Sequence, residues 1–283
     1  MSVIHLWRRE RGTKTAFVLG GGGNLGAVQV GMLAAVLEQG VTPDLLVGCS
    51  VGALHAAVLA AHPTLAAARR LEDIWLRLDG EDLLPSGHLS PLRLLARRRP
   101  SLDTGEGLCR LIDRCNALAT FEEASVPFEV VATSADTGRE RWFARGSVRD
   151  ALLASCALPA VFPPVEIDGE RYIDGGVVNN VPISRALALG AHRIWVFHVG
   201  NFPRPRSDFR RPVDVLLQAF SISRSHRFAA DVESVPASVE LVVPPGVDPG
   251  GIRYNDFGHT RELIDRGYES TVAFLAERGE AAG

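Results

Sequence analysis

The sequence predicts an α/β protein in which helices cover both faces of a parallel β-sheet. Two short apolar runs, residues 15–19 and 45–47, have the character of buried strands, and each precedes a segment with the periodicity of a helix. A glycine-rich turn separates strand from helix in both cases. Strands that alternate with helices in this way are typical of parallel sheets, which are buried on both faces.

The first two helices are predicted from their apolar positions. Between residues 24 and 39 apolar side chains recur every three or four residues, and Gly40 is suited to end the helix. The second helix is expected over residues 51–61, where most side chains are alanine. Such small side chains allow a helix to lie close to the sheet and to the neighbouring helix.

The rest of the chain gives less regular signals. Residues 63–126 are expected to be mostly helical, with a basic run on a solvated helix face: Arg93, Arg97, Arg98 and Arg99. The other expected elements are strands at 128–133, 140–144 and 193–199, a hairpin at 166–173, and helices at 150–156, 213–228 and 260–278. No repeat or linker divides the chain. We therefore predict one domain, residues 1–283, with a motif-bearing core over about 15–199 and a helical C-terminal part over about 200–283.

Composition narrows the choice of function. The chain has 283 residues, of which 46% are hydrophobic and 22% charged, as in globular proteins. A net charge of -3 provides no general attraction to nucleic acid or to an anionic membrane. The four cysteines lack the Cys-x-x-Cys spacing of a zinc or redox site, so we expect free thiols, no metal and no cofactor. Charges near the start and the lack of a long apolar stretch favour a cytoplasmic protein.

The two glycine-rich turns carry the most informative chemistry. Gly48-Cys49-Ser50-Val51-Gly52 has the Gly-x-Ser-x-Gly pattern, which exposes a serine hydroxyl on a sharp strand-to-helix bend. The earlier loop, residues 20–26, leads into a helix, so its free N–H groups could hold the oxyanion that forms when a serine attacks a carbonyl. Both turns leave the carboxyl ends of strands, where open α/β sheets bind ligands.

The same loop also fits a rival hypothesis, that of a nucleotide-binding domain. Gly21-x-Gly23-x-x-Gly26 is a dinucleotide fingerprint, and Asp44 lies near the distance expected of a ribose-binding acid. The acid should close the second strand, however, whereas Asp44 opens it and Ser50 stands at its end. We therefore expect no nucleotide.

A serine nucleophile needs a base, and the sequence offers two kinds. Among the histidines, His55 lies on the alanine-rich helix and is interpreted as a packed side chain, while His259 has the chain order that a catalytic triad requires. Asp174 is the stronger candidate. The motif Asp174-Gly175-Gly176 follows a strand, so it places a carboxylate at a strand end beside flexible backbone.

These residues resemble the patatin-like phospholipase family over roughly residues 15–199. Three blocks carry the resemblance in order and spacing: residues 21–26, residues 48–52, and residues 154–159 with 162–165, 174–176, Asn180 and Pro182. The resemblance implies a three-layer α/β/α sandwich with a mainly parallel central sheet. It also implies a serine hydrolase that cleaves acyl esters of phospholipids or other lipids, with acyl lipid as its substrate.

The resemblance further implies roles for individual residues. Ser50 would be the nucleophile and Asp174 the general base, in a dyad without histidine that forms an acyl-enzyme. Backbone N–H groups of Gly21, Gly22 and Gly23 would line the oxyanion hole, and Gly48 and Gly52 would shape the nucleophile turn.

Two positions depart from the family pattern. Leu25 stands where Lys or Arg is frequent, and Cys49 stands where threonine is frequent. Leu25 supports one alternative, a catalytically weak lipid-binding or regulatory module. A second alternative keeps Ser50 but uses a histidine as base, which would make the protein an α/β-hydrolase-type esterase with a Ser-His-Asp triad.

The expected helix at 213–228 suggests a contact with lipid. It carries apolar side chains along one side, namely Val213, Leu216, Leu217, Phe220 and Phe228, with Arg224 and Arg227 nearby. Such a helix could cover an acyl pocket or touch a membrane surface transiently. The alternative is a surface helix whose apolar side faces the protein core.

Overall fold

An eight-stranded sheet forms the centre of the computed structural model, which describes residues 12–78, 80, 104–199, 212–248, 250, 252 and 256–281. Five strands pair in parallel in the order β3-β2-β1-β7-β8, and β4, β5 and β6 are joined to this set by antiparallel pairs. The strands are β1 Thr15–Leu19, β2 Leu45–Cys49, β3 Phe128–Ser134, β4 Glu140–Phe143, β5 Val165–Ile167, β6 Glu170–Asp174, β7 Arg193–Phe197 and β8 Glu240–Val242.

Helices connect the parallel strands, as is usual for crossovers between parallel neighbours. They are α1 Gly26–Glu38, α2 Val51–Ala61, α3 Leu65–Leu76, α6 Glu106–Cys115, α7 Val148–Ser155, α8 Ile183–Ala188, α9 Pro212–Glu233 and α10 Thr260–Ala281. Short 3-10 turns stand at Gly23–Leu25, Phe121–Glu123 and Gly175–Val177. Side-chain caps fix two of the starts, because Thr64 accepts a hydrogen bond from an N–H of α3 and Ser147 accepts one from α7.

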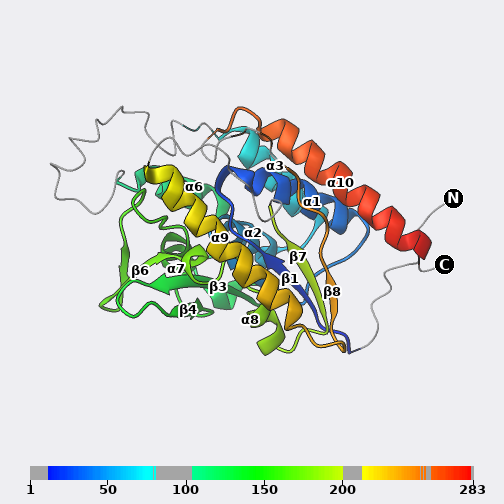
Figure 1. Cartoon of the computed structure of the whole chain (residues 1–283), viewed down its shortest axis with the longest axis horizontal. Helices are drawn as coiled ribbons and strands as arrows, with labels where there is room; N and C mark the ends of the chain where they lie inside the picture. Colours follow the sequence, from blue (N-terminus) through cyan, green and yellow to red (C-terminus); the bar gives the residue numbers. More distant parts are fainter. Residues whose placement is uncertain are drawn as a thin grey trace.

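The alternation of side chains in β1 separates two cores. Phe17 and Leu19 belong to a large cluster that includes residues of α1, α2, α3, α6, α7 and α10. Ala16 and Val18 belong to a second cluster, in which Ile183 of α8 and Phe228 of α9 take part. The fold is thus a three-layer sandwich with α8 and α9 on one face of a mostly parallel sheet. In Figure 1, α9 crosses in front of the strands, while α1, α3 and α10 lie together at the upper right.

The structure confirms most of the predicted elements and extends several. The first helix begins at Gly26 because Gly23–Leu25 form a 3-10 turn, and the helix predicted at 213–228 runs on to Glu233. Sequence reasoning did not identify β8 or α8. The arginine run at 93–99 lies outside the described residues. Among those residues, no helix combines the length and apolar character that crossing a bilayer demands.

Candidate active site

The strands β2 and β6 are far apart in the sequence, but they pair with successive parts of the same edge of β3. Cys49, at the end of β2, pairs with Val131, and Asp174, at the end of β6, pairs with the next residue, Ala132. Residues 130–133 of β3 also pair with β4. Because a strand has only two edges, β4 occupies one, and β2 and β6 share the other. The register of the sheet therefore brings Ser50, just after β2, beside Asp174.

Ser50 lies on a strained turn between β2 and α2. Its backbone angles, φ 53° and ψ -126°, are in a region that a residue with a side chain rarely adopts. The flanking glycines make the turn possible: a Cβ atom at Gly48 would lie 2.6 Å from Cα of Ala53, and one at Gly52 would lie 2.2 Å from the carbonyl oxygen of Leu19. The serine N–H donates to Oγ of Ser155 at 2.9 Å, which holds the turn against the end of α7.

Asp174 is buried, with 4% of its surface exposed, and its carboxylate accepts a hydrogen bond from the hydroxyl of Ser50. Oγ of Ser50 donates to Oδ2 of Asp174 at 2.7 Å, and the N–H of Gly176 donates to Oδ1 at 2.7 Å. The backbone of Asp174 is fixed as well, because its carbonyl accepts a hydrogen bond from Thr133 and its N–H donates to the carbonyl of Ala157. The carboxylate is thus held in one orientation by contacts on both oxygens.

Burial governs the ionisation of this site. It raises the pKa of Asp174, and hydrogen bonds from Ser50 and Gly176 together with the charge of Arg224 only partly oppose this shift. Burial also raises the pKa of the Cys49 and Cys156 thiols well above the ordinary value, and the nearby Asp174 carboxylate adds to it. The thiols are therefore neutral neighbours, and Asp174 is a stronger base than an exposed aspartate.

The glycine loop packs directly against the serine. A Cβ atom at Gly21 would lie 3.1 Å from Cβ of Ser50 and 2.7 Å from Oδ1 of Asn180, so only glycine fits there. The N–H of Gly21 donates to the carbonyl of Asn180 at 3.0 Å, and the Asn180 side chain donates back to the Gly21 carbonyl at 3.2 Å. Gly22 and Gly23 continue the loop, with Gly23 at φ +60°. The Gly21 N–H is thus already engaged.

A buried chain of hydrogen bonds supports the loop from behind. The indole N–H of Trp75 donates to Nε2 of His55 at 2.8 Å, and Nδ1 of His55 lies 2.6 Å from Oε1 of Gln29. Gln29 in turn donates to the carbonyls of Gly20 and Phe197. Since an indole can only donate, Nε2 of His55 must accept, and the ring proton is assigned to Nδ1. Burial lowers the pKa of His55 to about 3.

The other candidates from the sequence lie elsewhere. His55 is a packed side chain, as predicted. His259 is about half exposed, and its ring nitrogens face Glu262 at 3.1 Å and Asp256 at 3.7 Å. Asp44 accepts a hydrogen bond from the N–H of Thr15, the first residue of β1, and so lies at the opposite end of these parallel strands from Ser50.

Three residues contribute to the site in ways that sequence reasoning missed. Ser155 holds the serine turn, and Asn180 holds the glycine loop; both belong to motif blocks, although no role was assigned to them. Arg224 of α9 reaches Oδ1 of Asn180 at 3.3 Å. Asn24, the polar side chain within the glycine loop, donates from Nδ2 to the carbonyl of Asp256 at 2.7 Å.

The fold and site together define an α/β protein with a serine on a strand-to-helix turn, hydrogen-bonded to a buried aspartate. The chain matches the family described as patatin-like phospholipase over residues 17–187, and it therefore belongs to that family. This assignment agrees with the resemblance found in the sequence motifs.

Individual relatives are larger proteins. Human patatin-like phospholipase domain-containing protein 6 is 30% identical over 192 residues, which are 67% of this chain and 14% of the relative. Lysophospholipase NTE1 of Chaetomium globosum is 27% identical over 305 residues, 98% of this chain and 19% of the relative. The chain thus spans less than a fifth of these relatives. The crystal structure of VipD from Legionella pneumophila shares the fold, with a TM-score of 0.54 at 15% identity, covering 94% of this chain and 67% of that one.

Proposed function

We propose that this chain is a serine acyl hydrolase in which Ser50 is the nucleophile and Asp174 the general base. The observation that carries the proposal is the 2.7 Å hydrogen bond from Oγ of Ser50 to Oδ2 of Asp174. A nucleophile within hydrogen-bond reach of a base, and a base held in place by further contacts, is the arrangement that nucleophilic catalysis requires.

The reaction proceeds in two steps. Oγ of Ser50 attacks the ester carbonyl while Oδ2 of Asp174 takes the hydroxyl proton, and the tetrahedral intermediate collapses when the alcohol leaves with that proton. Water then gives a proton to Asp174 and attacks the acyl-enzyme carbonyl, and the serine oxygen regains the proton as the fatty acid departs. Burial of Asp174 supports this role, because it raises the pKa of a side chain that is otherwise a weak base.

The oxyanion of each intermediate is assigned to the N–H groups of Gly22 and Gly23. Gly21 completes the loop structurally, since its own N–H bonds to Asn180. The N-terminal end of α2, which Ser50 caps, adds a favourable dipole for negative charge at the serine oxygen. Losing one oxyanion donor typically costs on the order of 3 kcal/mol in the transition state, so this loop contributes at least as much as the base.

The substrates we propose are acyl esters of lipids, with phospholipid or lysophospholipid first among them. The support is family membership and the names of the relatives, which are phospholipase domain-containing proteins and a lysophospholipase.

The decisive experiment compares Ser50→Ala and Asp174→Asn with the parent chain on a short p-nitrophenyl ester and on a panel of phospholipids. Both variants should lose nearly all turnover while circular dichroism shows an intact fold. Asp44→Asn is the matched control, because it neutralises another carboxylate at the far end of β2 and should keep full activity. Wild-type turnover by Ser50→Ala or by Asp174→Asn would refute the proposal.

Both alternatives from the sequence are tested with the same material. A histidine triad predicts that His259→Ala abolishes turnover, whereas the aspartate base predicts no change. A non-catalytic lipid-binding module predicts no covalent adduct when the protein meets a fluorophosphonate, whereas the acyl-enzyme mechanism predicts an adduct on Ser50.

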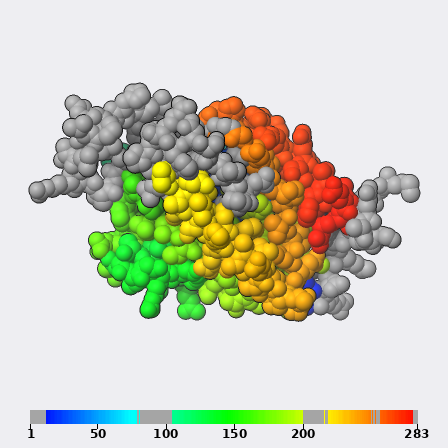
Figure 2. Space-filling view, in the orientation of Figure 1, coloured from blue at the N-terminus to red at the C-terminus, as the bar shows by residue number. Residues whose placement is uncertain are grey.

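We also propose a transient contact between α9 and a lipid surface. Phe228 faces the core, which favours the interpretation of α9 as a packed surface helix, but Val215 and Ile222 are 53% and 43% exposed on its outer side. Figure 2 shows α9, in yellow and gold, as a raised band across this face. Replacing both exposed side chains with serine should weaken binding to phospholipid vesicles, and unchanged binding would refute the contact.

A further inference from the structure

Arg224 of α9 is a partly buried cation that the proposed mechanism does not use. Its guanidinium lies 4.5 Å from the ring centroid of Phe220, and its Nη1 donates to Oδ1 of Asn180 at 3.3 Å. Within the described part of the chain, its buried Nε has no hydrogen-bond partner, and no carboxylate lies within ion-pair distance. Leaving a buried N–H without a hydrogen-bond partner is costly, so the position of this side chain calls for a functional reason.

The side chain reaches the active site along two routes. The first is mechanical, because Asn180 joins Arg224 to the glycine loop through two hydrogen bonds with Gly21. The second is electrostatic, because the charge of Arg224 acts on both Asp174 and Cys49. Burial lowers the pKa of Arg224, and the charge of Asp174 opposes that shift, so the guanidinium stays protonated.

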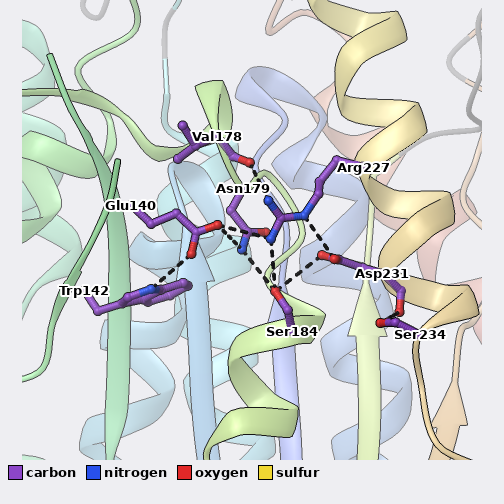
Figure 3. A network of polar contacts seen from close by, with 8 residues as sticks. All are labelled: Glu140, Trp142, Val178, Asn179, Ser184, Arg227, Asp231 and Ser234. Atoms are coloured by element: carbon purple, nitrogen blue, oxygen red, sulfur yellow. Dashed lines mark hydrogen bonds and ion pairs between the residues drawn. The ribbon is translucent and has the colours of Figure 1, made fainter. Parts of the chain in front are cut away.

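A separate network fixes the position of α9 over the site. Three residues beyond Arg224, Arg227 donates to Glu140 of β4, to Asp231 of α9, to Ser184 of α8 and to the carbonyl of Val178. Figure 3 shows this side chain extending from α9 into the group formed by these residues and Asn179. Arg224 and Arg227 therefore both donate hydrogen bonds to the same segment, residues 176–184, which comes shortly after Asp174 in the chain.

We infer that Arg224 is a positioning residue of the Ser50–Asp174 site: it holds Asn180 against the glycine loop, and its charge acts on the Asp174 carboxylate. The inference rests on the proposed function.

The test measures kcat and KM against pH for a neutral short p-nitrophenyl ester, and KM for a phospholipid at one pH. The variants are Arg224→Met, which removes charge and donors, Arg224→Lys, which keeps the charge, and the matched control Arg227→Met, which removes the neighbouring arginine. Among the described residues, Asp174 is faced by the hydroxyl of Ser50, the thiols of Cys49 and Cys156, and Arg224, and only Arg224 is a cation. The acid limb of the profile therefore reports how well Arg224 stabilises the carboxylate.

In Arg224→Met we expect the acid limb to move to higher pH, because the carboxylate loses its cation and the pKa of Asp174 rises further. Its kcat should also fall about tenfold with KM nearly unchanged, since a hydrogen bond to a charged group is lost. Arg224→Lys should return the limb towards its original pH. Arg227→Met should lower the Tm and leave the limb in place. If Arg224→Met does not fold, Arg224→Gln takes its place and must show the same shift.

Three results would overturn the inference. They are an unchanged acid limb in Arg224→Met, an equal shift in Arg227→Met, and a change in KM confined to phosphate-bearing substrates, which would make Arg224 a substrate ligand. The variant Ser50→Ala, measured in the same assay, distinguishes an error in the role of Arg224 from an error in the proposed serine mechanism. If that variant stays active, the serine mechanism is wrong; if it is inactive and Arg224→Met behaves like the parent, only the role of Arg224 is wrong.

Discussion

Acid should destabilise this protein through His55, a buried residue that takes no part in the proposed chemistry. The side chain lies between Trp75 and Gln29, with 1% of its surface exposed, and burial lowers its pKa from 6.5 to about 3. Below pH 6.5, His55 therefore becomes protonated in the unfolded state but stays neutral in the folded state. The stability that neutral His55 provides is complete above that pH and is lost as the pH falls towards 3.

The size of the effect follows from the width of this window. Each pH unit between the unfolded and folded pKa values costs roughly 1.4 kcal/mol of unfolding free energy. Two units below the unfolded value, at about pH 4.5, the loss is about 3 kcal/mol. Domains of this kind are stable by about 5–15 kcal/mol, so one histidine removes a large share of the total.

Urea unfolding at about pH 7 and about pH 4.5 measures the loss, with His55→Gln as the comparison. Acidic groups with lowered pKa values, such as Glu72 and Asp136, also lose stability in acid, but they are common to both proteins and cancel in the difference. The variant should be less stable at neutral pH, and the gap should shrink by about 3 kcal/mol in acid. A gap that stays constant within about 1 kcal/mol would refute the reasoning.

Two further predictions concern the serine turn and the hydrogen bonds behind the glycine loop. Gly52→Ala should lower both Tm and activity sharply, because the new Cβ would lie 2.2 Å from the carbonyl oxygen of Leu19, and a variant with wild-type Tm would show that the turn can relax. Trp75→Phe should cost about 1–3 kcal/mol in urea unfolding, because Nε2 of His55 loses its buried donor. A difference below about 0.5 kcal/mol would mean that another donor replaces the indole.

Strands with clear burial patterns were predictable from the sequence. All five residues of β1 and of β2 are buried, so each reads as an unbroken apolar run. β8 was not predictable in the same way, because it has three residues and only Val242 is fully buried. α8 has six residues and follows Pro182, which leaves too few positions for a helical period to show.

The candidate site was predictable in part. The motifs identified Ser50 and Asp174, which the structure places within hydrogen-bond distance, although their catalytic roles remain predictions. The motif could not show that the N–H of Gly21 donates a hydrogen bond to the carbonyl of Asn180. This bond depends on how the segment after Asp174 folds back towards the glycine loop. Arg224 was noted in the sequence only as a charge beside the apolar side of its helix, because its contact with Asn180 depends on how α9 packs against the segment after Asp174.

The pairing along β3 explains why the two reactive side chains can be so far apart in sequence and still meet reliably. Cys49 pairs with Val131 and Asp174 with Ala132, so hydrogen bonds of the sheet set their separation, and the lengths of the connecting segments do not enter. A change in the connection between β2 and β3 therefore need not move the pair. Exchanging that connection between relatives should leave the Ser50–Asp174 geometry intact, because the register of β2 and β6 on β3 is unchanged.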